Sequence, residues 1–293
     1  MTELFPNIFY IPGENNSRFP YCACLYLKGR EMRVLIDAGM GARRLEPVKK
    51  WGIDILILTH CHIDHRLTCK EIPDVPVWCH EADAPFLNDR NLFYHGIGLQ
   101  RSGLDFSAGF NVSHDLFEIE IKHYLFDGQC VDLGGITLQT IHTPGHTPGH
   151  LAFYVPEAEL LFTADVDLTT FGPFYGHDFA DIGKFLLSIE RLKQLNAGIV
   201  ATGHAGPFNG QVIEKFNQYE EVFYQRDQLV LDQLTQPMAL SDFGNRNLIF
   251  RSYPDFPALM QWFELVHIEK HLERLKAMGK VRCVHDTWML TSI

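Results

Sequence analysis

The sequence predicts an α/β protein whose reactive side chains lie where apolar strands end. Residues 53–58 form an apolar run that leads directly into Thr59-His60-Cys61-His62-Ile63-Asp64-His65. Two later apolar runs, at 160–163 and 199–202, also end in a ligand type, Asp165 and His204. Helical patterns at about 43–51 and 179–195 alternate with these runs. Open α/β folds present their sites at the carboxyl ends of strands. The alternation of strands and helices and the polar residues at the strand ends therefore both predict an α/β fold with its functional site at that edge.

The segment from His60 to His65 has the spacing of a metal site. An extended chain rises by about 3.3 Å per residue, so His60 and His62 lie on one side of it and can bind one cation at about 2.0–2.1 Å. Asp64 and His65 follow and can face a second cation. A histidine-rich solvated loop, or a helix with one polar face, is the alternative. The apolar run directly before the segment argues against both.

Two cations need further ligands, and candidates occur downstream. Thr143-Pro144-Gly145-His146-Thr147-Pro148-Gly149-His150 combines histidines with the glycines and prolines of tight turns. His142 and His150 flank His146 at four-residue spacing and compete with it as ligands, or serve structural roles.

These residues resemble the metallo-β-lactamase superfamily. The resemblance implies a four-layer αβ/βα sandwich with a dinuclear site between two sheets. It implies that His60, His62 and His146 bind a first metal, that Asp64, His65 and His204 bind a second, and that Asp165 bridges the two. Arg66 departs from the small residue that the family often has there, which affects the packing of the loop and the substrate mouth.

The implied chemistry is metal-dependent hydrolysis. Two divalent cations lower the pKa of a bridging water from 15.7 toward about 7, which supplies a hydroxide at neutral pH, and Asp64 is placed to orient it. Histidine and carboxylate ligands suit zinc best, with iron or manganese as alternatives. The loop after Asp165 carries Tyr175 and His177, our candidates for substrate contact or proton donation. The alternative is a glycine- and proline-rich loop with packed aromatic residues.

Several positions near these motifs keep two interpretations. Three strand-like runs lie between residues 7 and 37, and Asp37 then either supports the ligand loop or is a plain turn residue. Cys61 either binds metal or points back into the core, which the alternation along an extended segment favours. Residues 86–126 are rich in aromatic side chains, including Phe106 and Phe110, and form either a lid or a locally packed insertion.

The chain after about residue 212 differs in character. An apolar stripe predicts a helix from Gln211 to Leu234, ended by Pro237. Residues 238–293 hold seven Lys or Arg against six Asp or Glu, a net of +1, which leaves −12 for residues 1–237 from the total of −11. A helix at 267–278, a stop at Gly279 and two short strands at 280–290 resemble a winged-helix module. We therefore expect a catalytic domain over 1–212 and a helical linker with a winged-helix-like module over 213–293.

Bulk properties limit the partners. An acidic chain argues against passive binding to a phosphate backbone, although Lys270, Arg274, Lys276, Lys280 and Arg282 give the C-terminal module a modest basic face. Packing or homodimer formation is the favoured role for that module. Seven cysteines without C-x-x-C spacing, and no signal-peptide pattern in the first six residues, predict reduced thiols in the cytoplasm. No apolar run approaches the ~20 residues of a membrane span.

The sequence thus favours a dinuclear metal-dependent hydrolase acting on a small ester, thioester or lactone. A nuclease or phosphodiesterase is the alternative, because the same site serves phosphoryl transfer. A di-iron redox module or a non-catalytic metal-binding scaffold is a third hypothesis. His62 stands where the di-iron branch of the superfamily tends to have Glu, which argues against the redox hypothesis. Fold alone does not decide among these functions.

Overall fold

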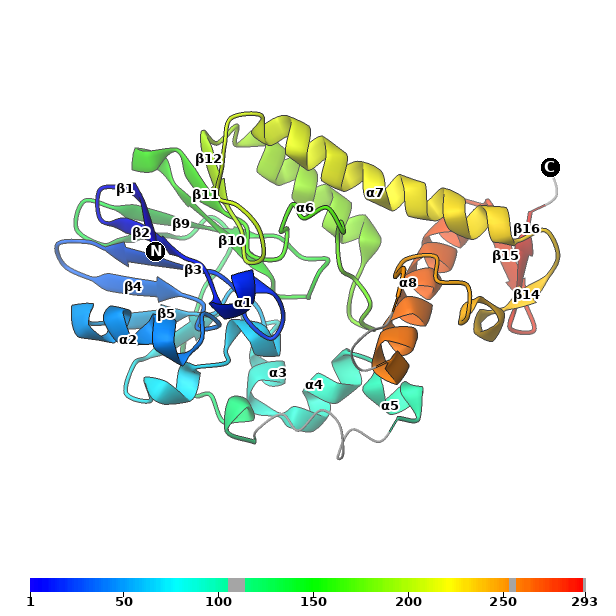
Figure 1. The fold of residues 1–293 in the computed structure, drawn as a ribbon, viewed down its shortest axis with the longest axis horizontal. Helices are drawn as coiled ribbons and strands as arrows, with labels where there is room; N and C mark the ends of the chain where they lie inside the picture. The colour runs from blue at the N-terminus through cyan, green and yellow to red at the C-terminus, as the bar shows by residue number, and fades with distance from the viewer. Residues whose placement is uncertain (105–113, 253–256, 292–293) are drawn as a thin grey trace.

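Two β-sheets lie face to face and helices cover their outer surfaces, as Figure 1 shows for this computed structural model. The structure describes residues 1–104, 114–252 and 257–291. The first sheet has seven strands in sequential order: β1 Thr2–Phe5, β2 Ile8–Ile11, β3 Cys24–Lys28, β4 Arg33–Ile36, β5 Ile55–Ile57, β6 Val77–Cys79 and β7 Ile121–Tyr124. The second has six, in the order β13 Phe208–Asn209, β12 Ile199–Ala201, β11 Leu160–Phe162, β10 Leu151–Val155, β9 Thr137–His142 and β8 Cys130–Asp132. This is the four-layer αβ/βα sandwich that the resemblance implied.

Three apolar cores hold the layers together. One fills the space between the sheets, where side chains such as Leu25 and Ile57 meet Phe153 and Phe162. A second lies under the helices on the outer face of the first sheet, and a third under α6 and α7 on the outer face of the second. Strands β3, β5 and β10 are apolar on both faces because each face is covered.

The helices in this part of the chain are α1 Glu14–Ser17, α2 Ala42–Trp51, α3 Ala84–Asn88, α4 Arg90–Gly96, α5 Leu99–Ser102, α6 Ile182–Gln194 and α7 Val212–Gln233. Three of them, α2, α6 and α7, lie close to the ranges expected from the sequence, and the others were not predicted. Short 3₁₀ turns occur at Ile63–His65, Cys69–Glu71, His114–Phe117 and Pro156–Ala158. Among the described residues, no helix is long and apolar enough to cross a bilayer.

The strand order places the site. β5 runs parallel to β4 and β6, and β11 runs parallel to β12, so the loops after β5, β11 and β12 open at one end of the sandwich. Backbone hydrogen bonds join the two sheets there, from Leu151 N to Thr59 O over 2.9 Å and from Ala23 N to Gly203 O over 2.6 Å. The ligand loops are therefore held together by backbone as well as by side chains.

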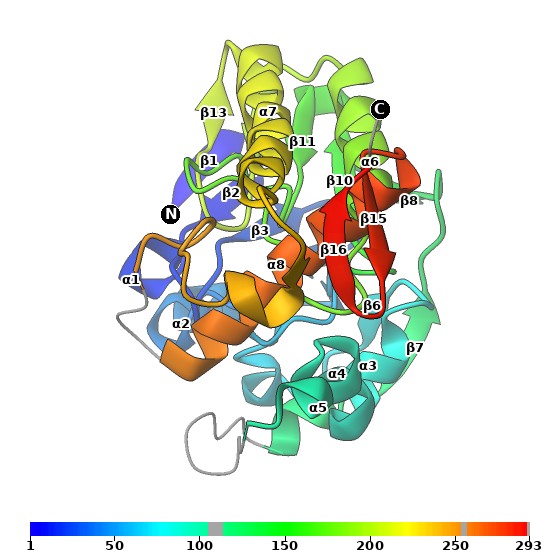
Figure 2. The same ribbon diagram turned by 90° about the vertical axis from the view of Figure 1, so that its right-hand side faces the viewer.

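The C-terminal segment packs against the same end of the sandwich. Helix α8, Pro257–Ala277, lies beside the end of α7, and Figure 2 shows a small sheet next to it, in the order β14 Met238–Ala239, β16 Thr287–Leu290 and β15 Val281–Val284. A 3₁₀ turn at Leu240–Phe243 follows β14. A separate apolar core packs the small sheet against α8 and the end of α7. The expected helix, stop and two strands are present. The winged-helix comparison and the boundary near residue 212 stay predictions.

The aromatic insertion is described only in part. Phe106 and Phe110 lie outside the described residues. Among those described, Phe93 is 2% exposed and its ring lies 5.5 Å from that of Phe117, and both belong to the core on the outer face of the first sheet. Whether the insertion moves as a lid stays a prediction.

Candidate metal centre

Seven side chains converge at the end of the sandwich where β5, β11 and β12 finish. The turn after β5 supplies four, the β9–β10 loop supplies one, and the segments after β11 and β12 supply one each: His60, His62, Asp64 and His65, then His146, Asp165 and His204. Gly203 leaves room for them, because a Cβ there would lie 3.0 Å from Asp165 Oδ1 and 3.1 Å from His65 Cε1. All seven positions predicted from the sequence meet in one place.

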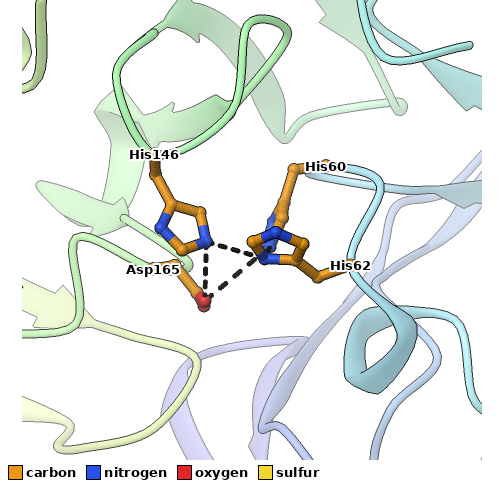
Figure 3. A group of neighbouring side chains, drawn as sticks. All are labelled: His60, His62, His146 and Asp165. Atoms are coloured by element: carbon orange, nitrogen blue, oxygen red, sulfur yellow. Dashed lines mark hydrogen bonds and ion pairs between the residues drawn. The ribbon is translucent and has the colours of Figure 1, made fainter. Parts of the chain in front are cut away.

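Four of these side chains form a first group, drawn in Figure 3. His62 Nδ1 lies 2.9 Å from His60 Nε2 and 2.8 Å from His146 Nε2. Asp165 Oδ2 lies 3.1 Å from His146 Nε2 and 3.7 Å from His60 Nε2. Three ring nitrogens and one carboxylate oxygen thus surround a common centre.

Asp64, His65 and His204 form a second group around the other oxygen of Asp165. Asp165 Oδ1 lies 2.8 Å from His65 Nε2 and 3.4 Å from His204 Nε2. Asp64 Oδ2 lies 3.3 Å from His204 Nε2. Each oxygen of Asp165 therefore faces a different group.

Hydrogen bonds outside the cluster fix which ring nitrogen faces inward. His146 Nδ1 lies 2.8 Å from the carbonyl of Phe174, and His204 Nδ1 lies 2.6 Å from that of Ser17. A carbonyl only accepts, so both Nδ1 atoms carry a proton and both Nε2 atoms face the cluster.

His65 and His60 are held in the same way. His65 Nδ1 donates to Asp37 Oδ2 over 2.8 Å. The hydroxyl of Thr59 donates to Asp37 over 2.9 Å and so accepts from His60 Nδ1, 3.0 Å away. Asp37 therefore supports the ligand loop, as one of the two sequence interpretations proposed.

The charges around the cluster are strongly perturbed. Burial lowers the pKa of His60 and His62 well below the usual value, with neighbouring histidines adding to the effect. Burial also acts on His65, but Asp165, Asp37 and Asp64 together raise its pKa well above the usual value. Burial opposes ionisation of Asp165 as well, yet the surrounding histidines hold its pKa well below the ordinary range. In the metal-free chain, protons therefore supply the positive charge between the carboxylates.

The donor set fits divalent cations. His60 Nε2 and His146 Nε2 both present lone pairs toward His62 Nδ1, and one Nδ1 proton makes an ordinary hydrogen bond to only one of them. Among the described residues, His65 Nε2 and Asp165 Oδ1 are buried, lie 2.8 Å apart and have no hydrogen-bond partner besides each other. A cation between these atoms would satisfy them, since neutral imidazoles and carboxylates are the ligands zinc, iron and manganese accept.

His177, predicted as a proton donor or substrate contact, lies beside the cluster. Its ring is 4.5 Å from that of His62, and it also contacts Phe174 and Phe263. It is 6% exposed, and its Nδ1 has no hydrogen-bond partner in the described part of the chain. Its place agrees with the sequence expectation, and its role stays a proposal.

Tyr175 is placed differently from what the sequence suggested. Its ring is fully buried and stacks on Phe223 of α7. Its hydroxyl accepts from Arg226 over 2.9 Å and lies 2.6 Å from His271 Nε2. Both capacities of the hydroxyl are engaged by the helices α7 and α8, so it is not available for substrate contact or proton donation.

The remaining candidates take structural positions. Cys61 is fully buried in the core, and His150 Nε2 accepts from the backbone of Asp165 over 3.2 Å. His142 stacks on His80 at 4.1 Å. Arg66 is fully buried above the rings of Phe93 and Phe117, so it joins the ligand loop to the aromatic insertion.

Sequence reasoning missed a buried carboxylate, Asp83. It accepts from Cys61 N over 2.8 Å, from the hydroxyl of Thr147 over 2.7 Å and from Gly149 N over 2.6 Å. It therefore joins the loop after β5 to the loop that carries His146. Asp83 stands in an ordinary turn after β6, and only the fold reveals its partners.

The geometry agrees with the comparison against protein families. The model of the metallo-beta-lactamase superfamily matches residues 18–204. This chain belongs to that superfamily. The match includes all seven converging residues.

Curated relatives carry activity names. The chain is 32% identical over 134 residues to a probable metallo-hydrolase, YqgX of Bacillus subtilis, across 44% of this chain and 57% of the relative. It is 26% identical over 196 residues to an atrochrysone carboxyl ACP thioesterase of Aspergillus fumigatus, across 64% and 50%. A beta-lactamase-like protein 2 homolog of Caenorhabditis elegans is 30% identical over 170 residues, across 57% and 54%. The chain spans about half the length of these three relatives. With the family match, their names support a metal-dependent hydrolase.

Solved structures confirm the fold. The metallo-beta-lactamase family protein TTHA1429 from Thermus thermophilus aligns over 99% of this chain and 100% of that one, with a TM-score of 0.79 and 23% identity. The protein TTHA1623, solved in a di-iron-bound form, aligns over 64% of this chain and 89% of that one, with a TM-score of 0.50 and 27% identity. The alignment with TTHA1429 includes the C-terminal segment, so the α7–α8 arrangement recurs in that protein.

Proposed function

We propose that this superfamily member is a dinuclear metal-dependent hydrolase. His60, His62 and His146 would hold one divalent ion, and Asp64, His65 and His204 the other. The observation that carries the proposal is the position of Asp165, whose two oxygens face the two groups at 3.1 Å and 2.8 Å from the nearest ring nitrogens. A carboxylate between two cations is the bridge that two-metal hydrolysis uses.

Bound divalent ions would lower the pKa of a water toward about 7 and polarise a carbonyl or phosphoryl oxygen. The chain's own residues do the rest. Asp37, Thr59 and the carbonyls of Phe174 and Ser17 orient the ligand rings before any ion binds. Asp64 lies 3.3 Å from His204 in the second group and would orient the attacking water there. Zinc is our first choice, with iron or manganese as alternatives.

A small acyl substrate is favoured by the aromatic side chains around the cluster. Phe179 stacks on His62 at 5.9 Å, and Phe174 and Phe263 enclose His177. Such rings suit the apolar body of an ester, thioester or lactone. The thioesterase relative has the same substrate chemistry in its name.

A nuclease is less favoured, because part of the basic face is engaged within the protein. Lys270 donates to the carbonyl of Asp178 over 2.8 Å and its side chain is 14% exposed. Arg274 pairs with Asp227 and its side chain is 17% exposed. Lys276, Lys280 and Arg282 are exposed. Three exposed charges give only a weak, salt-sensitive attraction for a phosphate backbone.

The test is turnover by metal-loaded protein on acyl thioesters, lactones and aryl esters, alongside phosphodiesters and single-stranded RNA. Asp165→Ala serves as the variant that loses the bridge, and Asp54→Ala, at a half-buried ion pair with Arg33, as the matched control. We expect acyl cleavage by the wild type and the control, with loss of both metal content and activity in Asp165→Ala. Cleavage of RNA or phosphodiesters alone would overturn the substrate class. Full activity in Asp165→Ala would overturn the dinuclear site.

A further inference from the structure

One peptide group connects the cluster to the C-terminal helix α8. The carbonyl of Phe174 accepts from His146 Nδ1 over 2.8 Å. The amide of the same peptide, Tyr175 N, donates to His267 Nε2 over 3.2 Å. The two sides of a single planar peptide thus contact a cluster histidine and a histidine of α8.

His267 fixes the direction in which that peptide points. Its Nδ1 lies 2.7 Å from the carbonyl of Phe263, one turn earlier in α8, and must donate to it. Burial and the nearby Arg226 lower the pKa of His267 well below the usual value, which keeps the ring neutral. Nε2 is therefore an acceptor, and it accepts only a peptide whose N–H faces it.

The direction of the peptide decides the tautomer of His146. With its carbonyl toward His146, the peptide requires a proton on Nδ1 and leaves the Nε2 lone pair facing His62 and Asp165. A reversed peptide would present its N–H to Nδ1, which would then have to accept. The proton would move to Nε2 and that atom would no longer bind a metal.

The rest of this loop is held by α7 and α8 as well. Arg226 of α7 donates to the carbonyls of Phe171 and Pro173 over 2.7 Å and 2.6 Å. The Tyr175 hydroxyl joins Arg226 to His271, whose Nδ1 donates to Asp227 over 2.7 Å.

The loop also lies directly against His267. A Cβ at Gly176 would lie 2.5 Å from His267 Cε1, so loop and ring are in close contact. Bulk at position 176 would push the peptide away from its acceptor.

We propose that His267 is a positioning residue for the first metal site, because it sets the Phe174–Tyr175 peptide and through it the tautomer of His146. Helix α8 is then a part of the active site rather than an independent appendage. The expected effect of His267 on metal binding rests on the proposed function. Its effect on the tautomer of His146 does not depend on any metal.

The first experiment uses full-length, metal-free protein. Long-range ¹⁵N–¹H correlation spectra report the tautomer of each histidine, with His146→Gln identifying the signals of His146. We expect wild type to show His146 protonated at Nδ1. His267→Phe keeps an aromatic ring but lacks the acceptor, so His146 should show a mixture of tautomers. His267→Gln offers a carbonyl oxygen near the position of Nε2 and should restore the wild-type pattern.

The second experiment measures metal binding by Co²⁺ titration with absorption spectra. Outer hydrogen-bond partners of metal ligands typically contribute 10–100-fold in affinity, so His267→Phe should weaken one of two binding events by roughly tenfold. The other event should be unchanged. Ile268→Ala, a cavity variant in the core beneath α8, controls for general loss of stability and should leave both events unchanged.

The outcomes separate this inference from the proposed function. An unchanged His146 tautomer in folded His267→Phe overturns the inference whatever the activity. An equal effect of Ile268→Ala on the tautomer also overturns it. A changed tautomer supports the inference, and if wild type then binds no Co²⁺ at the cluster, the proposed function fails while the positioning role stands.

Discussion

The Asp37 carboxylate accepts from His65 Nδ1 over 2.8 Å in a pair with no exposure to solvent. Its other oxygen accepts from the backbone of Thr59 over 2.9 Å. Burial, the largest influence, raises the pKa of Asp37 despite these hydrogen bonds. Asp37 thereby holds the start of the ligand loop and one of its rings in a single arrangement.

We expect Asp37→Asn to weaken metal binding by roughly 10–100-fold, the range for outer partners of a ligand histidine. The asparagine amide has a single acceptor oxygen, so its NH₂ group would face either His65 or the Thr59 backbone, both of which donate. Competition with a chromophoric chelator measures the affinity. Asp54→Asn makes the same change at a half-buried ion pair with Arg33 and should leave the affinity unchanged. Equal affinities in both variants would contradict the role of Asp37.

The meeting place of the cluster could be predicted because several of its members stand just past an apolar strand, whereas His146 was selected over His142 and His150 by the family resemblance. His60, Asp165 and His204 follow β5, β11 and β12 within a few residues, and parallel strands bring their carboxyl ends together. Local pattern and spatial proximity coincide at these positions. The bounds of α2, α6 and α7 were also close, since each shows one apolar stripe.

The supporting residues could not be predicted for the opposite reason. The Asp83 carboxylate accepts from the backbone of Cys61, and the backbone carbonyl of Ser17 accepts from His204. Both contacts join residues that are distant in the chain, and no local spacing in the sequence marks them. The predicted start of the last helix was ten residues late. Residues 257–266 carry apolar side chains around much of the helix, because α8 contacts α7, the loop after β11 and its own small core. A helix covered on several sides has no single stripe.

Arg66 should be sensitive even to lysine. Its guanidinium donates to the carbonyls of Leu87 and Leu116 over 3.2 Å and 2.6 Å and lies over two aromatic rings. Burial lowers the pKa of Arg66 to about 10, so it stays charged at neutral pH. Both hydrogen bonds come from Nη1, and a lysine side chain ends one atom shorter and has no planar group to lie over the two rings. We expect Arg66→Lys to lower the free energy of unfolding by about 1–3 kcal/mol in urea titrations.

The control for Arg66 is the same substitution at Arg43, which is exposed. It should change the unfolding free energy by less than about 0.5 kcal/mol. A result in which the two variants are equally stable would mean that the buried guanidinium contributes nothing specific.

Asp83→Asn tests the carboxylate that joins two ligand loops. Asp83 accepts three hydrogen bonds, and the amide would turn an NH₂ group toward at least one donor. We expect a loss of about 2–4 kcal/mol in unfolding free energy, from one lost charged hydrogen bond and an unsatisfied buried donor.

Asp89 offers a matched comparison. It caps α4 by accepting from Asn91 N and Leu92 N, and asparagine caps a helix about as well as aspartate. Asp89→Asn should therefore be nearly neutral. Similar losses in the two variants would show that the charge of Asp83 is not what holds the loops.

His80 should make stability depend on pH between 6.5 and 4. It is 9% exposed and stacks on His142, and burial, then His142, lowers its pKa to about 4 despite the opposing effect of Asp127. The unfolded chain, with a pKa near 6.5, binds the proton first, so acidification favours unfolding and stability is lost as pH falls from about 6.5 to about 4. The loss is at most about 3 kcal/mol by the conversion of 1.36 kcal/mol per pKa unit.

His80→Asn keeps an acceptor for Ala82 N but does not titrate. Unfolding in urea from pH 7.5 to 4 measures the effect. On acidification the unfolding free energy of the wild type should fall by more than that of His80→Asn. Parallel pH curves would show that His80 is as easily protonated in the folded protein as in the unfolded chain.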